Sequence, residues 1–275
     1  MSDRRLTPAN GRVAHVSLKG QVVAERFTEG DPARIAVPLA DLLAAPGGRR
    51  DRQVLMGEGV LVLDRHAGFA FVQAEKDGYC GYLAEAALGP DRAATHWVSA
   101  PATHLYRAPD LKTPEVALLT MGARLTIAAE HPRFLETADG LFVPRPHLAR
   151  IGDWTKDPAG VAERFFGTPY LWGGNSRSGI DCSGLVQAAL TACGIACPGD
   201  SDLQERALGV ALPAGAAYQR GDLFFWKGHV AMAVGPDRLI HANGFHMAVG
   251  YEGIADAIAR IEGRGEGSVT SVGRL

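Results

Sequence analysis

The segment NSRSGIDCSGLVQAAL, residues 175–190, places a cysteine between a glycine-containing loop and an apolar run. The apolar residues of CSGLVQAALTACG recur at helical spacing, which predicts a helix that ends at Gly194. Cys182 then occupies the helix N-terminus, where unpaired N–H groups and the helix dipole favour a negative charge, so we expect the pKa of its thiol to fall. The ordinary alternative is a small buried residue with no chemical role.

The segments around this helix predict an α+β domain. DPAGVAERFFG (157–167) indicates a short helix with Asp157 as N-cap and Pro158 at its first position. Three apolar stretches joined by tight turns follow and predict strands: GDLFFW (221–226), HVAMAVG (229–235) and RLIHANG (238–244). Helices first and hairpin-connected strands after them are typical of an antiparallel sheet with helices segregated from it.

The first half of the chain is turn-rich and contains a weak internal repeat. Residues 56–88 and 121–148 share Met-Gly, an alternating strand, a Phe-centred strand, Asp-Gly and a closing Leu. This pattern predicts two small β-barrels. Residues 1–50 are interpreted as an extension packed on the first barrel, with a helical candidate at VPLADLLAA (37–45). The expected domains are 1–90 (extension plus first module), 91–152 (second module) and 153–275.

A nucleophilic cysteine needs a base, and the base needs a group that orients it. His229 and His241 lie on two consecutive predicted strands. An odd-membered loop between these strands brings both histidines to one face, diagonally adjacent, and we predict such a loop. His246 is an alternative to His241 as the orienting residue.

Composition excludes several partners. The chain has 275 residues and a net charge of -2, with no Lys or Arg run that could follow a phosphate backbone, so nucleic acid is not expected. No signal-peptide core and no transmembrane-length segment is visible, which predicts a soluble, cytoplasmic protein that does not bind membranes. The four cysteines are interpreted as thiols; Cys193 and Cys197 lack a second pair of ligands, so neither a metal nor a cofactor is predicted.

The last third of the chain resembles the NlpC/P60 family of papain-like cysteine peptidases, through GTPYLWGGNSRSGIDCSGLVQ, PGDSDLQ, GDLFFWKGHVAMAVG and LIHA. The resemblance covers about residues 157–260. The two repeated modules resemble bacterial SH3-like domains that precede such peptidases. The expected fold is therefore multidomain, with two small SH3-like β-barrels followed by an α+β papain-like domain with an antiparallel sheet.

The resemblance implies the roles of individual residues. Cys182 is the nucleophile, His229 the general base and acid, and His241 the residue that orients His229. The Cys182 N–H and Tyr170 are expected to stabilise the oxyanion. The remaining residues are expected to form the substrate site. Asp181 and Ser183 bind the ammonium group, and Tyr170 and Ser201 line the same pocket. Glu58 and Tyr82 reach the alanine end of the substrate from the first module, and Trp172 packs the loop that shapes the cleft. For Asp181 the alternative is a helix N-cap, for Glu58 a turn acid, and for Tyr82 and Trp172 core packing.

The function implied is that of a γ-D-glutamyl-L-diamino acid endopeptidase acting on murein tri- and tetrapeptides with a free N-terminal L-alanine, in cell-wall peptide recycling. Three alternatives stay open: an exported hydrolase of intact peptidoglycan, an acyltransferase or amidase with the same catalytic residues, and an inactive binding module. The sequence indicates neither the preferred diamino acid nor the oligomeric state.

Overall fold

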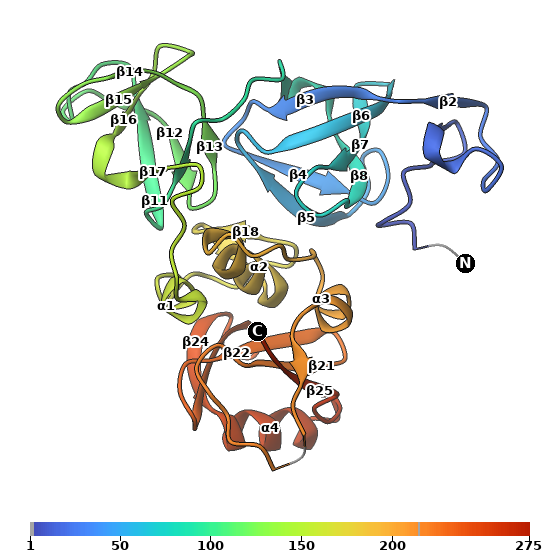
Figure 1. Ribbon diagram of the computed structural model, residues 1–275, viewed down its shortest axis with the longest axis vertical. Helices are drawn as coiled ribbons and strands as arrows, with labels where there is room; N and C mark the ends of the chain where they lie inside the picture. The colour runs from blue at the N-terminus through green and yellow to red at the C-terminus, as the bar shows by residue number, and fades with distance from the viewer. Residues whose placement is uncertain (1–2, 214) are drawn as a thin grey trace. The chain divides into compact units, whose positions relative to one another are not determined.

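The computed structural model describes residues 3–213 and 215–275. The chain divides into two units, unit 1 (Met1–Ile151) and unit 2 (Gly152–Leu275), which Figure 1 shows in blue to green and in yellow to red. The sequence placed the start of the last domain at residue 153, one position from this division. No helix in the described ranges is long and apolar enough to cross a membrane.

Unit 1 is built from β-sheets, the largest of which has seven strands. In sheet order these are β5 (Arg50–Leu55), β4 (Leu39–Leu43), β8 (Cys80–Ala84), β7 (Phe69–Ala74), β6 (Gly59–His66), β3 (Asp31–Ile35) and β9 (Leu88–Gly89). One face carries a core of Val, Leu, Ile and Ala side chains around the fully buried Tyr79. The order begins at β5 and ends at β9, so the sheet is open. The expectation of two closed barrels is therefore not confirmed.

The helical candidate at residues 37–45 is wrong, because this segment contains strand β4. Ala40 and Leu42 are buried on either side of the exposed Asp41, which is the alternation of a strand. Pairing with β5 on one side and β8 on the other satisfies the backbone of β4, and this tertiary pairing overrides the helix preference of Leu and Ala. Strands β3 and β4 thus belong to the first module itself.

The rest of unit 1 forms three smaller sheets. A five-stranded sheet has the order β12 (Glu115–Thr120), β11 (Ala102–Tyr106), β16 (Phe142–Pro144), β15 (Phe134–Thr137) and β14 (Ile127–Glu130). A three-stranded sheet has the order β13 (Arg124–Leu125), β10 (His96–Val98) and β17 (Leu148–Arg150). A parallel pair joins β1 (Val13–His15) to β2 (Arg26–Thr28). Single 3-10 turns are η1 (Val16–Leu18), η2 (Glu85–Ala87) and η3 (Arg145–His147).

The turn between β5 and β6 requires glycine at position 57. Gly57 has φ +75°, and a Cβ at this position would overlap the carbonyl oxygen of Arg124. The N–H of Arg124 donates a 2.8 Å hydrogen bond to the carbonyl of Met56. The backbones of the two repeated segments therefore touch at this turn, which a side chain would separate.

Unit 2 has an antiparallel six-stranded sheet. Its order is β20 (Val210–Ala211), β25 (Ser271–Arg274), β21 (Leu223–Trp226), β22 (His229–Ala233), β23 (Arg238–Asn243) and β24 (Ala248–Gly253). The helices are α1 (Pro158–Glu163), α2 (Cys182–Ala192), α3 (Ser201–Ala207) and α4 (Ile254–Gly263), and a small hairpin joins β18 (Asn175–Ser176) to β19 (Gly179–Ile180). The predicted helices and strands, and the antiparallel sheet, are confirmed.

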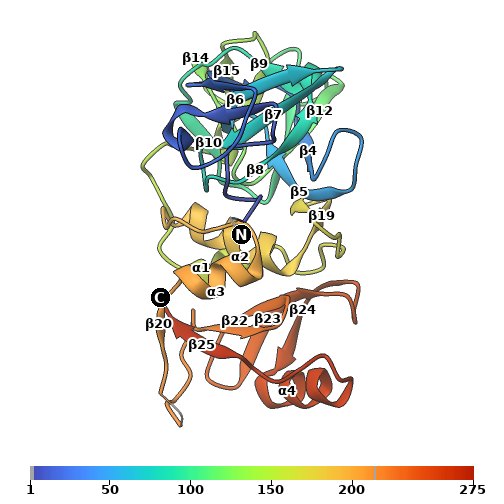
Figure 2. The same cartoon turned by 90° about the vertical axis from the view of Figure 1, so that its right-hand side faces the viewer.

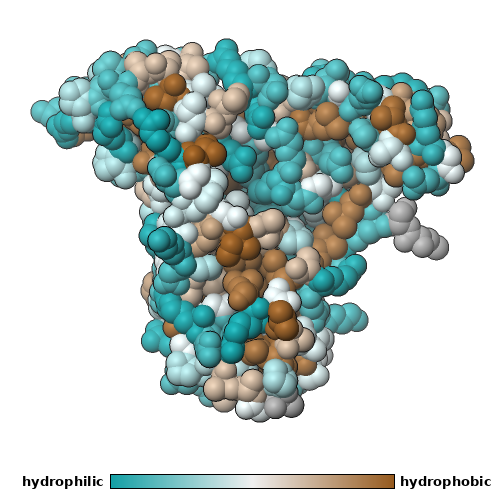
Figure 3. Space-filling model, in the orientation of Figure 1, coloured by the Kyte–Doolittle hydropathy of each residue, from teal (hydrophilic) through white to brown (hydrophobic). Residues whose placement is uncertain are grey.

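The sheet of unit 2 lies between two helical layers. Helices α1, α2 and α3 lie on one side of it and α4 on the other (Figure 2). Helix α4 buries Ile254, Ala257 and Ile261 against Phe224 and Trp226 of β21. This apolar contact anchors α4 beside the ends of β22 and β23. On the surface, apolar side chains are interspersed with polar ones over the face that Figure 3 shows.

Candidate active site

Asp181 fixes the N-terminus of α2 and the loop before it. Its Oδ1 accepts hydrogen bonds from the Gly184 N–H (2.7 Å) and the Ser183 hydroxyl (3.0 Å), and its Oδ2 accepts one from the Gly173 N–H (2.9 Å). This is the geometry of an N-cap, which satisfies a backbone donor that the helix leaves unpaired. Asp181 therefore positions the first turn of α2, and with it Cys182.

Cys182 is buried, with 8 % of its surface exposed. The backbone N–H groups of Val230, Ser183 and Cys182 itself lie within hydrogen-bonding range of its sulfur. Burial raises the pKa of the thiol to about 12, with a further increase from the charge of Asp181, and the backbone donors offset only part of this. The expected fall in pKa is therefore wrong, because removal of water outweighs the helix terminus. The resting site holds a neutral thiol.

His229 and His241 lie on one face of the sheet, as predicted. Met232 pairs with Ile240 and Ala233 with Leu239, a register that closes through a three-residue loop between Val234 and Arg238. The prediction of an odd-membered loop is confirmed. His229 Nε2 lies 2.9 Å from His241 Nδ1. Because the N–H of Val230 reaches the sulfur of Cys182, the residue that carries the thiol lies beside the start of β22, where His229 is found.

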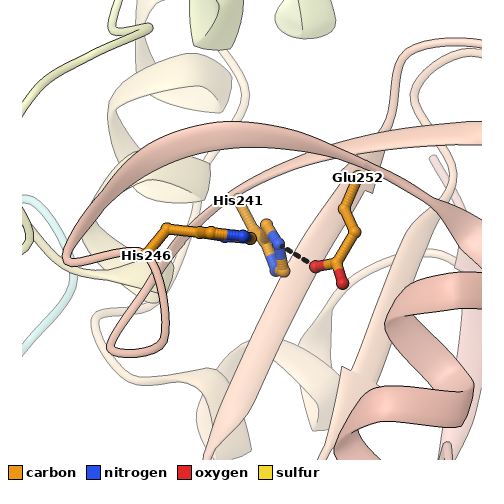
Figure 4. A group of neighbouring side chains, drawn as sticks. All are labelled: His241, His246 and Glu252. Carbon is orange, nitrogen blue, oxygen red and sulfur yellow. Dashed lines mark hydrogen bonds and ion pairs between the residues drawn. The ribbon is translucent and has the colours of Figure 1, made fainter.

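A carboxylate and a guanidinium continue the chain of hydrogen bonds behind His241. Glu252 Oε2 lies 3.1 Å from His241 Nε2, as the dashed line in Figure 4 shows. Arg260 holds the same carboxylate through two hydrogen bonds of 2.8 Å each. The hydrogen bond from Arg260 is the main reason that the pKa of Glu252 falls to about 2. Glu252 is therefore an acceptor without a proton at neutral pH.

This order of partners determines the protonation of both rings. Burial lowers the pKa of His241 and lowers that of His229 to about 3, so both imidazoles are neutral. Since Glu252 can only accept, His241 carries its proton on Nε2 and leaves Nδ1 as an acceptor. His229 must then donate from Nε2, and its Nδ1 is unprotonated. Nδ1 of His229 is therefore the ring nitrogen that can accept a proton.

His246 does not replace His241 as the orienting residue. Its ring lies near the ring of His241 and the carboxylate of Glu252 (Figure 4). Ligand atoms of the three residues lie within 4.8 Å of one another, which is close enough for a metal ion. However, Glu252 is engaged by both Arg260 and His241, so a cation would have to displace a guanidinium. The hydrogen-bonded relay accounts for this group without a metal.

Tyr170 and Ser183 lie next to Cys182. Burial raises the pKa of Tyr170, and the thiolate form of Cys182 and the charge of Asp181 raise it further, so its hydroxyl stays protonated and can donate. Ser183 follows Cys182 and gives its hydroxyl to Asp181. The side-chain amide of Gln204 on α3 donates to the carbonyl of Ser183 (2.9 Å).

Ser201 and Trp172 lie on separate elements of unit 2. Ser201 is buried and is the first residue of α3. Trp172 lies in the loop before β18 and exposes 68 % of its surface, so the alternative of core packing is wrong for this residue. Their expected roles in substrate binding stay predictions.

The two residues expected to act from unit 1 are held within that unit. Glu58 is buried, pairs with Lys76 Nζ at 2.6 Å and accepts from the Leu55 N–H at 3.0 Å. Tyr82 packs against Phe71, with ring centroids 5.0 Å apart. Both sets of contacts stabilise the seven-stranded sheet, and the expected contacts of Glu58 and Tyr82 with substrate stay predictions.

Sequence reasoning missed Glu252 and Arg260. The available signal was the hairpin register: His241 pairs with Gly250 and Leu239 with Glu252, which puts Glu252 diagonally beside His241 on the same face. Arg260 gives no such signal, because it reaches Glu252 from α4 rather than from the sheet.

Comparison with known proteins finds relatives of both units. The NlpC/P60 family matches residues 167–259, and the bacterial dipeptidyl-peptidase Sh3 domain matches residues 42–88, which supports one SH3 domain. The γ-D-glutamyl-L-lysine dipeptidyl-peptidase of Bacillus subtilis is 32% identical over 214 residues, 69% of this chain and 71% of that protein. The protein of the same name from Bacillus cereus is 28% identical over 231 residues, 70% of this chain and 67% of that protein. The structure superposes on a crystal structure of an NlpC/P60 family protein from Bacillus cereus with a TM-score of 0.75 and 23% sequence identity. The match covers 89% of this chain and 99% of that chain, and it supports the fold.

Proposed function

Because this chain belongs to the NlpC/P60 family and is a cysteine peptidase, we propose that it cleaves the γ-D-glutamyl bond to the diamino acid of murein stem peptides. Two relatives, of which this chain covers 67% and 71%, are named γ-D-glutamyl-L-lysine dipeptidyl-peptidases. The observation that carries the proposal is the relay from Glu252 to His229, which leaves an unprotonated nitrogen for the proton of Cys182.

The reaction begins from a neutral pair. His229 Nδ1 takes the thiol proton as the sulfur of Cys182 attacks the γ-carbonyl carbon of D-glutamate. The Cys182 N–H and the Tyr170 hydroxyl stabilise the oxyanion. The imidazolium of His229, supported by His241 and Glu252, then protonates the leaving amine, and a water molecule activated by His229 hydrolyses the thioester.

The substrate we propose carries a free N-terminal L-alanine. Asp181 lies beside the nucleophile, and a carboxylate is a sound anchor for an ammonium group. Ser183, Tyr170 and Ser201 are the polar groups we assign to the same pocket.

A requirement for this free amine places the activity in recycling. The alanine amine of a stem peptide becomes free only after an amidase has separated the peptide from sugar. We therefore propose a cytoplasmic enzyme that releases L-Ala-γ-D-Glu from tri- and tetrapeptides, rather than a hydrolase of intact wall.

Mass spectrometry of products tests the proposal. Purified protein is incubated with L-Ala-γ-D-Glu-meso-diaminopimelate and with its N-acetylated form, and Cys182→Ala is the blank. Release of L-Ala-γ-D-Glu from the free-amine peptide alone is expected. Cleavage of both peptides would remove the amine requirement and the recycling role, and cleavage of neither would remove the substrate class.

A further inference from the structure

A cavity of about 470 Å³ borders His229, and none of the residues assigned to the acyl side of the substrate lines it. Its walls come from the turn between β21 and β22, the loop between β23 and β24, and α4. They include Lys227, His229, Asn243, Phe245, Arg260 and Arg264. A cavity of this size holds a small ligand such as one amino-acid residue.

Chemistry decides which part of the substrate this cavity faces. His229 must protonate the leaving nitrogen, and a general acid works only within hydrogen-bond reach of the atom it protonates. The residue that bears this nitrogen must therefore lie beside His229. Tyr170 and Asp181 lie near Cys182, on the acyl side. A cavity that shares His229 and none of these residues fits the leaving residue.

The walls of the cavity carry cationic groups that are only partly neutralised. Lys227 is exposed and has no ion-pair partner among the described residues. Arg264 pairs with Glu266 through Nε, which leaves its terminal nitrogens without a partner in the described ranges. Its guanidinium lies 5.1 Å from the ring centroid of Phe245, and that of Arg260 lies 4.7 Å from the same ring. The stacking holds both guanidinium groups at the cavity.

We infer that this cavity is an anionic subsite that binds a carboxylate of the leaving diamino acid, through Lys227 and Arg264. The inference rests on the proposed function and deepens it. A leaving residue can supply the carboxylate from its α-carbon, when it ends the peptide, or from its side chain, as diaminopimelate does and lysine does not. Both sources present the same chemistry to the two cations.

Two pairs of peptides distinguish these sources. L-Ala-γ-D-Glu-L-Lys is compared with its C-terminal amide to test the α-carboxylate. The meso-diaminopimelate peptide amidated at its α-carboxyl is compared with the L-Lys amide to test the side-chain carboxylate. Since a charge-assisted hydrogen bond is worth about one decade or more in binding, KM is expected to be roughly tenfold lower for the carboxylate in at least one pair.

Arg264→Gln and Lys227→Met are expected to bring that KM ratio close to one while the amide peptides are cleaved as before. Arg65→Gln, which removes a similarly exposed arginine paired with Glu85 in unit 1, should keep the wild-type ratio. Equal KM values within both pairs, or a ratio that survives the double variant Arg264→Gln with Lys227→Met, would overturn the subsite and leave the proposed function intact. Failure of the unaltered protein to cleave any of the four peptides would remove the proposed function and the subsite together.

Discussion

Replacement of Glu252 by glutamine tests the relay behind the nucleophile. The wild-type carboxylate accepts from two sides, from Arg260 through two 2.8 Å bonds and from His241 Nε2 at 3.1 Å. Glutamine keeps the shape of the side chain but has one acceptor oxygen and one donor nitrogen. In the wild type one oxygen, Oε2, accepts from both His241 Nε2 and Arg260, while Oε1 accepts from Arg260 Nε alone. The amide oxygen of Glu252→Gln therefore takes the Oε2 position, where it keeps two acceptor contacts, and the amide nitrogen faces Arg260 Nε.

This orientation keeps the proton of His241 on Nε2 but removes the negative charge behind the relay. A hydrogen bond that involves a charged group is worth about 1.5–3 kcal/mol and a neutral one about 1 kcal/mol. The imidazolium that forms on His229 is then stabilised less, by about 0.5–2 kcal/mol. This difference corresponds to a roughly 2- to 30-fold loss of kcat.

Steady-state kinetics on L-Ala-γ-D-Glu-meso-diaminopimelate measures this loss, and KM should change by less than about threefold because Glu252 does not contact substrate in the proposed mechanism. Nitrogen-15 NMR of the histidine rings should show His241 still protonated on Nε2. Glu163→Gln is the matched control, since Glu163 also accepts from an arginine, Arg220, within unit 2 but outside the relay. A kcat of Glu252→Gln within twofold of wild type, or an equal loss in Glu163→Gln, would refute the reasoning.

Three other outcomes follow from the site. The rate at which iodoacetamide alkylates Cys182 can be measured by mass spectrometry of the peptide that contains this residue. Because the thiol pKa is about 12, this rate should increase about tenfold per pH unit between roughly pH 6 and 9. A rate that is constant below pH 7 would instead indicate a thiolate–imidazolium pair. The folded-state pKa values of His229 and His241 lie below the unfolded value of 6.5, so the unfolded chain binds more protons than the native chain as the pH falls. The midpoint of urea unfolding should therefore decrease as the pH drops from 6.5 to 5. The decrease should be smaller in His229→Gln. Asp181→Ala should destabilise unit 2 by about 1 kcal/mol through loss of the N-cap. Asp181→Asn should keep most of that stability in thermal unfolding but lose the preference for the free-amine peptide over the N-acetylated peptide. An unchanged preference in Asp181→Asn would assign Asp181 to capping alone.

Local patterns of the sequence were sufficient for much of unit 2. The apolar spacing after Cys182 predicted α2. The N-cap that Asp181 provides was the alternative to its expected role in substrate binding. Strand alternation and loop parity predicted that His229 and His241 share a face. These features depend on residues close together in the chain, where helix and hairpin geometry determines which side chains meet.

Features that depend on distant residues were predicted less well. The segment at 37–45 has the composition of a helix, yet it forms β4 because strands β5 and β8 supply its hydrogen bonds. The repeat in unit 1 predicted two barrels, but whether a sheet closes depends on whether its edge strands pair, and β5 and β9 do not. Neither outcome can be predicted from the spacing of apolar residues within one segment.

The sequence by itself predicted the helix that starts at Cys182, the face that His229 and His241 share and the order of helices and strands that carries them, because each follows from a short-range pattern. The tertiary structure alone decided the state in which these groups rest. Burial raises the pKa of Cys182 and lowers that of His229, and desolvation depends on everything packed around a group rather than on its neighbours in sequence. The same packing brings Arg260 of α4 to Glu252 of β24, and that contact completes the relay which selects the proton-accepting nitrogen of His229.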